Sequence, residues 1–122
     1  MKPVDAVLLC PGDPVRRALA RSLEREGELR ILAAVDPREA LAEVTRLKPE
    51  VVVLLFDGSA SALAAIQDVM ASRPTPILLL RAHSVGLEAA SRGLESGAVD
   101  VALAPAGDDP EAFAALRGRI RR

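Results

Sequence analysis

The chain of 122 residues is 50% hydrophobic and 27% charged, a size and composition that fit one domain with a single core. With 16 basic and 17 acidic residues its net charge is -1, so it lacks the positive field that attracts nucleic acids or anionic membranes. Its 1 cysteine excludes an internal disulfide and suits the reducing cytoplasm, and its apolar runs are far shorter than the ~20 residues that span a bilayer.

Short apolar runs, rich in leucine or β-branched residues, predict the strands of a sheet. In chain order these runs are Val4–Leu9, Leu29–Val35, Val51–Phe56, Pro76–Leu80 and Val99–Leu103. Most of them are nearly continuous in apolar residues, which is typical of parallel strands that are covered on both faces. The helices are therefore expected on both sides of the sheet.

After each strand, apolar residues recur at spacings of three and four, which predicts amphipathic helices with one buried side each. In chain order the expected buried sides are Val15, Ala18, Leu19, Ser22 and Leu23; Ala40, Leu41, Val44 and Leu47; Leu63, Ile66, Val69 and Met70; Leu87, Ala90 and Leu94; and Phe113, Leu116 and Ile120.

An aspartate followed by proline marks the start of three helices. The pairs are Asp13-Pro14, Asp36-Pro37 and Asp109-Pro110. An aspartate side chain accepts the free N–H groups of the first turn, and proline at the next position loses no hydrogen bond there. Glu39 is expected to complete a capping box in the second helix. We interpret these aspartates as structural caps, each worth ~1 kcal/mol.

Alternating strands and helices joined by right-handed crossovers predict an α/β flavodoxin-like fold. It is a (βα)5 three-layer sandwich around a parallel sheet of order 2-1-3-4-5, with residues 1–122 forming this single domain. In such a sheet, ligands bind at the carboxyl ends of the strands, near the switch point between the first and third strands. The loops that begin at Cys10, Asp57, Arg81 and Ala104 are therefore the expected functional edge.

Three segments resemble parts of a known family. They are Asp13–Leu19 at the first helix, Arg73–Ile77 before the fourth strand, and Gly97–Asp100 at the fifth. In this order they resemble the receiver domain of bacterial response regulators, and the last two are similar to the N-terminal receiver of chemotaxis protein-glutamate methylesterases. The resemblance covers essentially the whole chain. It implies the same fold and a role in two-component or chemotaxis signalling, as the regulatory domain of a methylesterase-like protein.

The resemblance also implies the positions of a phosphorylation site. Phosphoryl transfer to an aspartate there uses an acidic pair that holds Mg²⁺, an acceptor aspartate, a hydroxyl and a lysine, because cations offset the charge on the transferred group. In this sequence the acidic pair corresponds to Cys10 and Pro11, and the acceptor aspartate to Leu55. The hydroxyl position is Arg81, the lysine position is Ala104, and the aromatic switch position is Val101. We interpret the chain as a pseudo-receiver, not itself an enzyme, that needs no cofactor and acts by phosphorylation-independent protein contacts.

Two alternative functions remain open. Asp57 lies two residues beyond Leu55, on the same side of the strand if the strand continues, and would be the acceptor of a phosphorylatable, Mg²⁺-dependent receiver. Its other interpretation is a turn residue before Gly58. Arg81 and His83 would instead form the site of a small-anion sensor. Cys10 is expected to be an inert, buried thiol.

The expected partners are proteins, with no nucleic acid and no membrane insertion. The resemblance implies a docking face made by the helix with Leu87 and Leu94, the strand Val99–Leu103 and the last helix, for a catalytic domain, another partner or a second copy. The cluster near the C-terminal end consists of Arg117, Arg119, Arg121 and Arg122. We expect these cations to interact with the negative end of the last helix.

Overall fold

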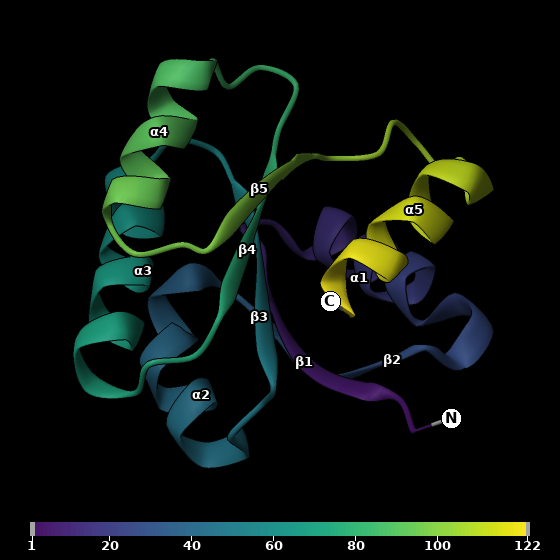
Figure 1. Ribbon diagram of the computed structural model, residues 1–122, viewed down its shortest axis with the longest axis horizontal. Coiled ribbons are helices and arrows are strands. Elements are labelled where there is room, and N and C mark those ends of the chain that lie inside the picture. Colours follow the sequence, from purple (N-terminus) through teal and green to yellow (C-terminus); the bar gives the residue numbers. More distant parts are fainter. Residues whose placement is uncertain (1, 122) are drawn as a thin grey trace.

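A parallel sheet lies between two layers of helices in the computed structural model, which describes residues 2–121 (Figure 1). The strands are β1 (Val4–Leu9), β2 (Leu29–Val35), β3 (Val51–Phe56), β4 (Ile77–Arg81) and β5 (Asp100–Leu103). Their order is β2-β1-β3-β4-β5, and every neighbouring pair is parallel. The predicted fold class and sheet order are confirmed.

Helices cover both faces of this sheet. They are α1 (Asp13–Glu24), α2 (Ala40–Leu47), α3 (Ala60–Ser72), α4 (Leu87–Glu95) and α5 (Pro110–Ile120), with short 3₁₀ turns at Arg25–Gly27 and Pro37–Glu39. Figure 1 shows α1 and α5 on one side of the sheet and α2, α3 and α4 on the other. The carboxyl ends of all the strands therefore open between these two helical layers.

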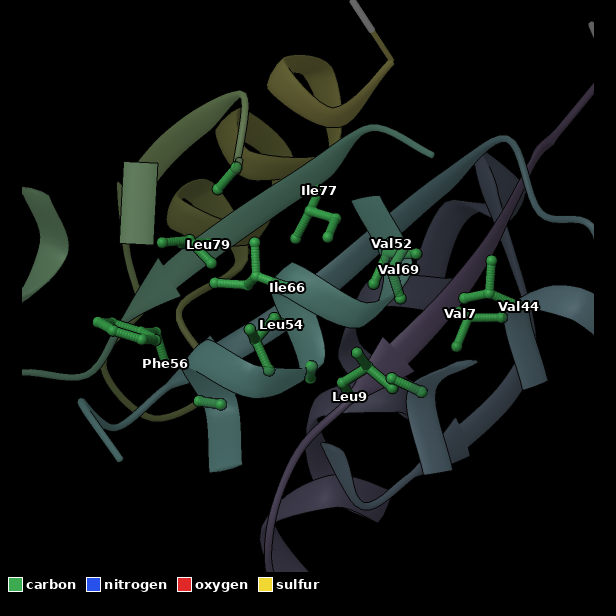
Figure 2. Packing of buried hydrophobic residues seen from close by; sticks show 14 of the residues in the cluster. Val7, Leu9, Val44, Val52, Leu54, Phe56, Ile66, Val69, Ile77 and Leu79 are labelled. Carbon is green, nitrogen blue, oxygen red and sulfur yellow. The ribbon is translucent and has the colours of Figure 1, made fainter. Parts of the chain in front are cut away.

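Each side of the sheet has its own apolar core. Toward α2, α3 and α4, strand residues such as Leu54 and Phe56 belong to one buried cluster with Ile66 of α3 (Figure 2). Toward α1 and α5, Val53 belongs to a second cluster that contains Phe113 of α5. Alternate residues of β3 thus enter opposite cores, which explains why the strand is apolar throughout.

The strands β4 and β5 each begin one residue later than predicted. Pro76 has no N–H to donate to the sheet, although its carbonyl accepts the Val52 N–H at 2.8 Å. The ladder therefore starts at Ile77 and continues to Arg81, which was expected in the following loop. Likewise, β5 starts at Asp100.

Two of the three predicted caps are confirmed. The Asp36 carboxylate accepts the Arg38 N–H at 2.9 Å, and the Asp109 carboxylate accepts the Glu111 N–H at 3.0 Å. The predicted capping box, in which the Glu39 carboxylate would accept the Asp36 N–H, is wrong. Instead, the backbone N–H of Glu39 donates to the Asp36 carbonyl at 2.9 Å. This backbone bond closes the 3₁₀ turn Pro37–Glu39 directly after the Asp36 cap.

Asp13 is not a cap. The helix α1 begins one residue earlier than predicted, so Gly12 occupies the N-cap position with a φ of 85°, a backbone conformation that favours glycine. The Asp13 carboxylate forms an ion pair with Arg16 one turn further along α1. It therefore still complements the positive end of the helix, through its charge.

The predicted buried sides of α1 and α4 are only partly correct. Leu23 is fully buried under α1, but Val15 in its first turn is 54% exposed. On α4, Ala90 is buried while Leu87 and Leu94 are 73% and 43% exposed. The helix α4 lies at the β4–β5 end of the sheet, and β5 is the last strand, so no further strand covers these leucines.

Candidate functional site at the carboxyl edge of the sheet

The crevice between the loops after β1 and β3 has an apolar floor. Leu9 of β1 pairs with Leu54 of β3, so the next residues, Cys10 and Leu55, are neighbours at the strand ends. Cys10 is fully buried, and Leu55 is half-buried against the same α1/α5-side cluster, which Ala104 also contacts. Three positions that the resemblance assigns to phosphorylation chemistry therefore meet as apolar or weakly polar side chains.

The Cys10 thiol is held in its protonated form. Its Sγ donates to the Pro11 carbonyl at 3.4 Å. Burial raises the pKa of the Cys10 thiol; Arg16 lowers it, while the charges of Asp36 and Asp57 raise it further. Since the net shift is upward, the thiolate, which is the reactive form, is disfavoured.

Arg16 enters the crevice, and sequence reasoning did not identify it as a site residue. Its Nη1 donates to the Cys10 carbonyl at 2.8 Å, its Nη2 pairs with Asp13, and its side chain is only 18% exposed. The Arg38 N–H is the main cause of the lowered pKa of Asp36, and the Arg16 charge adds to that effect. Arg16 thus places a fixed positive charge beside the loops after β1 and β2.

Asp57 lies at the mouth of the crevice and forms a turn. It is exposed, and its carboxylate accepts the Ser59 N–H at 2.9 Å. The Ser59 hydroxyl in turn accepts the Ala62 N–H at 3.1 Å and caps α3. This geometry is that of an aspartate turn that leads into a helix cap. Phosphorylation at Asp57 stays a prediction.

The residues at the metal position do not fit Mg²⁺. This ion prefers carboxylate, carbonyl and water oxygens, but the two positions that the resemblance assigns to the acidic pair hold the Cys10 thiol and Pro11, which has no ligand atom in its side chain. Within residues 2–121, no three acidic, histidine or cysteine side chains converge as a metal-binding group.

Arg81 and His83 have separate partners. Arg81 Nη1 donates to the Val85 carbonyl at 2.8 Å, and His83 Nε2 lies 2.9 Å from the Ala104 carbonyl. Nothing in these contacts brings the two side chains to a common ligand, so the anion site stays a prediction. Val101, at the switch position, is half-buried against the cluster beneath α3 and α4.

Arg117 and Arg119 lie in the last turn of α5, at its negative end as expected, and the arginines of this cluster also bind groups outside the helix. Arg117 is 3% exposed and donates to the Ser22 carbonyl of α1 at 2.9 Å. Arg119 binds Asp100 at 2.8 Å, and Arg121 binds Glu28 at 2.6 Å. These contacts join the C-terminal end of α5 to α1, to β5 and to the turn before β2. Arg122 lies outside the described residues.

None of the helices within residues 2–121 has the length and apolar character needed to cross a bilayer.

The chain is similar in sequence to protein-glutamate methylesterases. No family model matches the chain. The protein-glutamate methylesterase/protein-glutamine glutaminase of Desulfitobacterium hafniense is 30% identical over 108 residues, which cover 86% of this chain and 28% of the relative. That of Methanococcus maripaludis is 34% identical over 96 residues, which cover 76% and 26%. The chain thus spans less than a third of the length of these relatives.

Solved structures show the same fold. The response regulator domain of Thermotoga maritima CheB has a TM-score of 0.72 and 16% identity, with 98% of this chain and 91% of that domain covered. The chemotaxis protein CheY4 of Vibrio cholerae has a TM-score of 0.77 and 21% identity, with coverage of 97% and 98%. At these identities the structural match concerns the fold alone, and the relatedness to methylesterases comes from the sequence matches.

Proposed function

Because this chain is a receiver domain of the response-regulator family, related in sequence to protein-glutamate methylesterases, we propose that it is a degenerate receiver that acts through protein contacts without accepting a phosphoryl group. The observation that carries the proposal is Leu55 at the acceptor position, packed against the cluster that contains Cys10. A hydrocarbon side chain has no oxygen for the phosphoryl group. As a regulatory domain of a methylesterase-like protein, the chain binds and does not catalyse.

The charges in the crevice support this proposal. Phosphoryl transfer needs cations that offset the charge growing on the transferred group. Here the lysine position is Ala104, and Arg16 is already bound to the Cys10 carbonyl and Asp13. We infer that Arg16 stabilises the loop after β1 without a metal ion, so that the domain keeps one conformation whether or not a phosphodonor is present.

An exposed apolar surface at the β4–β5 end of the sheet supports protein docking. We define the α4–β5 face by four exposed large apolar side chains: Leu87 at 73%, Leu94 at 43%, Val99 at 62% and Leu103 at 49% exposure. Val99 and Leu103 share a side of the β5 segment, and β5 is an edge strand. Several large apolar side chains left exposed on neighbouring elements are typical of protein interaction sites.

An arginine–aspartate pair joins β5 to α5 beside this face. Arg119 donates through Nε and Nη2 to both carboxylate oxygens of Asp100, each at 2.8 Å, and Nη2 also donates to the Val101 carbonyl at 2.9 Å. The Arg119 guanidinium lowers the pKa of Asp100. We propose that the α4–β5 face, bordered by this pair, docks a second copy of the chain, and that the same face serves a catalytic domain in methylesterase-like proteins.

Self-association tests this function. Leu94→Asp should weaken dimerisation at least about tenfold, because it places a charge on the apolar α4–β5 face. Val15→Asp is the matched control, since Val15 is also an exposed apolar helix residue but belongs to α1 on the other side of the sheet. Sedimentation velocity over a range of protein concentrations measures the self-association of the native chain and of both variants. Adding acetyl phosphate and Mg²⁺ should leave the self-association of each unchanged.

Two results contradict the proposal. A chain that stays monomeric at every concentration rules out the second copy as the occupant of the α4–β5 face. Association that requires acetyl phosphate and disappears in Asp57→Asn shows instead a phosphorylation-dependent receiver.

A further inference from the structure

A second feature of the carboxyl edge is an open groove between α1 and the loop that joins β5 to α5. Its volume is about 760 Å³, within the ~300–1,000 Å³ of small-molecule sites. The apolar part of its lining includes Val15, Ala18 and Leu19 of α1, Leu55 of β3, Ala104 and Phe113. The groove therefore begins at the degenerate acceptor position and extends along α1.

The wall formed by α1 is an apolar stripe that the protein leaves uncovered. Val15, Ala18 and Leu19 lie three and four residues apart, hence on one side of the helix. Sequence periodicity predicts that they are buried, yet Val15 is 54% exposed, Ala18 is exposed and Leu19 is only half-buried. A bound apolar body would cover this stripe and gain the free energy that burial supplies.

The rim of the groove carries one unpaired charge, and it is positive. Arg25 pairs with Asp108 at 3.2 Å, and His83 contacts the Ala104 carbonyl. Arg21 also lines the groove, and its side chain has no hydrogen-bond or ion-pair partner among residues 2–121. A ligand that fits both the wall and the rim thus combines an apolar body with an anionic group.

We propose that this groove binds a small amphipathic carboxylate, with its apolar body along Val15, Ala18 and Phe113 and its carboxylate at Arg21. Inorganic phosphate would leave the apolar wall uncovered, and a neutral apolar molecule would leave Arg21 without a partner. The proposed carboxylate partner is Arg21, whereas the anion site expected from the sequence uses Arg81 and His83, of which His83 also lines this groove. It also goes beyond the proposed function, because it requires neither dimerisation nor the absence of phosphorylation.

Three small molecules separate the contributions of the apolar body and the charge. In a titration of the ¹⁵N-labelled chain, octanoate should produce saturable shifts at the amides of Val15, Ala18 and Phe113. The alcohol 1-octanol should bind at the same amides about threefold more weakly, the value expected for loss of an exposed ion pair. Acetate, which has the charge without the apolar body, should produce no saturable shift.

Substitutions in the groove then locate the site. Ala18→Trp fills the groove and should abolish binding of both octanoate and 1-octanol. Arg21→Gln should weaken octanoate about threefold and leave 1-octanol unchanged. Arg92→Gln is the matched control, because Arg92 is an exposed arginine of α4 on the opposite side of the sheet. This substitution should leave the binding of octanoate and of 1-octanol unchanged. If Ala18→Trp alters amides outside the groove, Val15→Trp provides a second filling variant.

The proposal is overturned by any of three results: octanoate binds both filling variants as well as the native chain, its shifts spread over both faces of the molecule, or acetate reproduces them. None of these results depends on the oligomeric state of the chain or on Asp57.

Discussion

Phe56→Ala should lower the free energy of unfolding by about 3–5 kcal/mol. Phe56 is fully buried at the end of β3 and packs in the cluster beneath α3 and α4 (Figure 2). Its ring approaches Gly93 of α4, where an added Cβ would lie 3.7 Å from the ring and 2.4 Å from Leu79 Cδ1. Since Gly93 has no side chain that could move into the space, the cavity would stay open. Urea unfolding followed by circular dichroism measures the change.

Val99→Ala is the control for this substitution. Val99 is 62% exposed, so its truncation should change the free energy of unfolding by no more than about 0.5 kcal/mol. A loss below about 1 kcal/mol for Phe56→Ala would show that the β3–α4 packing described above is wrong.

Leu55→Asp should lower the free energy of unfolding at pH 7 by about 2–3 kcal/mol. The substitution removes a half-buried leucine from an apolar floor and places a carboxylate there. Desolvation raises the pKa of a buried carboxyl above its unfolded value of about 3.9. The charge penalty is therefore absent below the unfolded pKa, at about pH 4, grows between the unfolded and the folded pKa, and is constant above the folded pKa. Urea unfolding measured at a series of pH values, from below about pH 4 up to pH 7, follows this penalty.

Leu55→Asn separates the charge from the shape. Asparagine has nearly the volume of aspartate without an ionisable group, so Leu55→Asn should lose stability to a similar extent at every pH. If Leu55→Asp is as stable as the native chain at pH 7, the crevice already solvates a carboxylate, and its apolar description is incorrect.

The strands show how far the sequence determines the fold. The bounds of β1, β2 and β3 were predicted to the residue, because continuous apolar runs end where polar or turn-forming residues follow. At β4 the prediction began at Pro76, whose apolar ring fits the pattern but whose missing N–H delays the ladder to Ile77. Periodicity describes side chains, whereas the ladder depends on backbone donors.

The candidate site was predicted less completely. The side chains at the strand ends follow from topology, so Cys10 and Leu55 were expected at this edge. Arg16 was missed because its contact with the Cys10 carbonyl depends on how a long side chain bends back, which spacing does not specify. The exposure of Val15 and Leu87 was also missed, because an apolar helix stripe does not reveal where the covering sheet ends.

The most direct test of the account is thermal and urea unfolding with beryllofluoride and Mg²⁺, which together mimic a phosphoryl group on an aspartate. A competent receiver at about 100 times the dissociation constant would gain about 2.7 kcal/mol. We predict no change in stability and no shift of the Cys10, Leu55 or Asp57 amides. A clear stabilisation that disappears in Asp57→Asn would contradict the account, because it would show that the crevice still accepts a phosphoryl group.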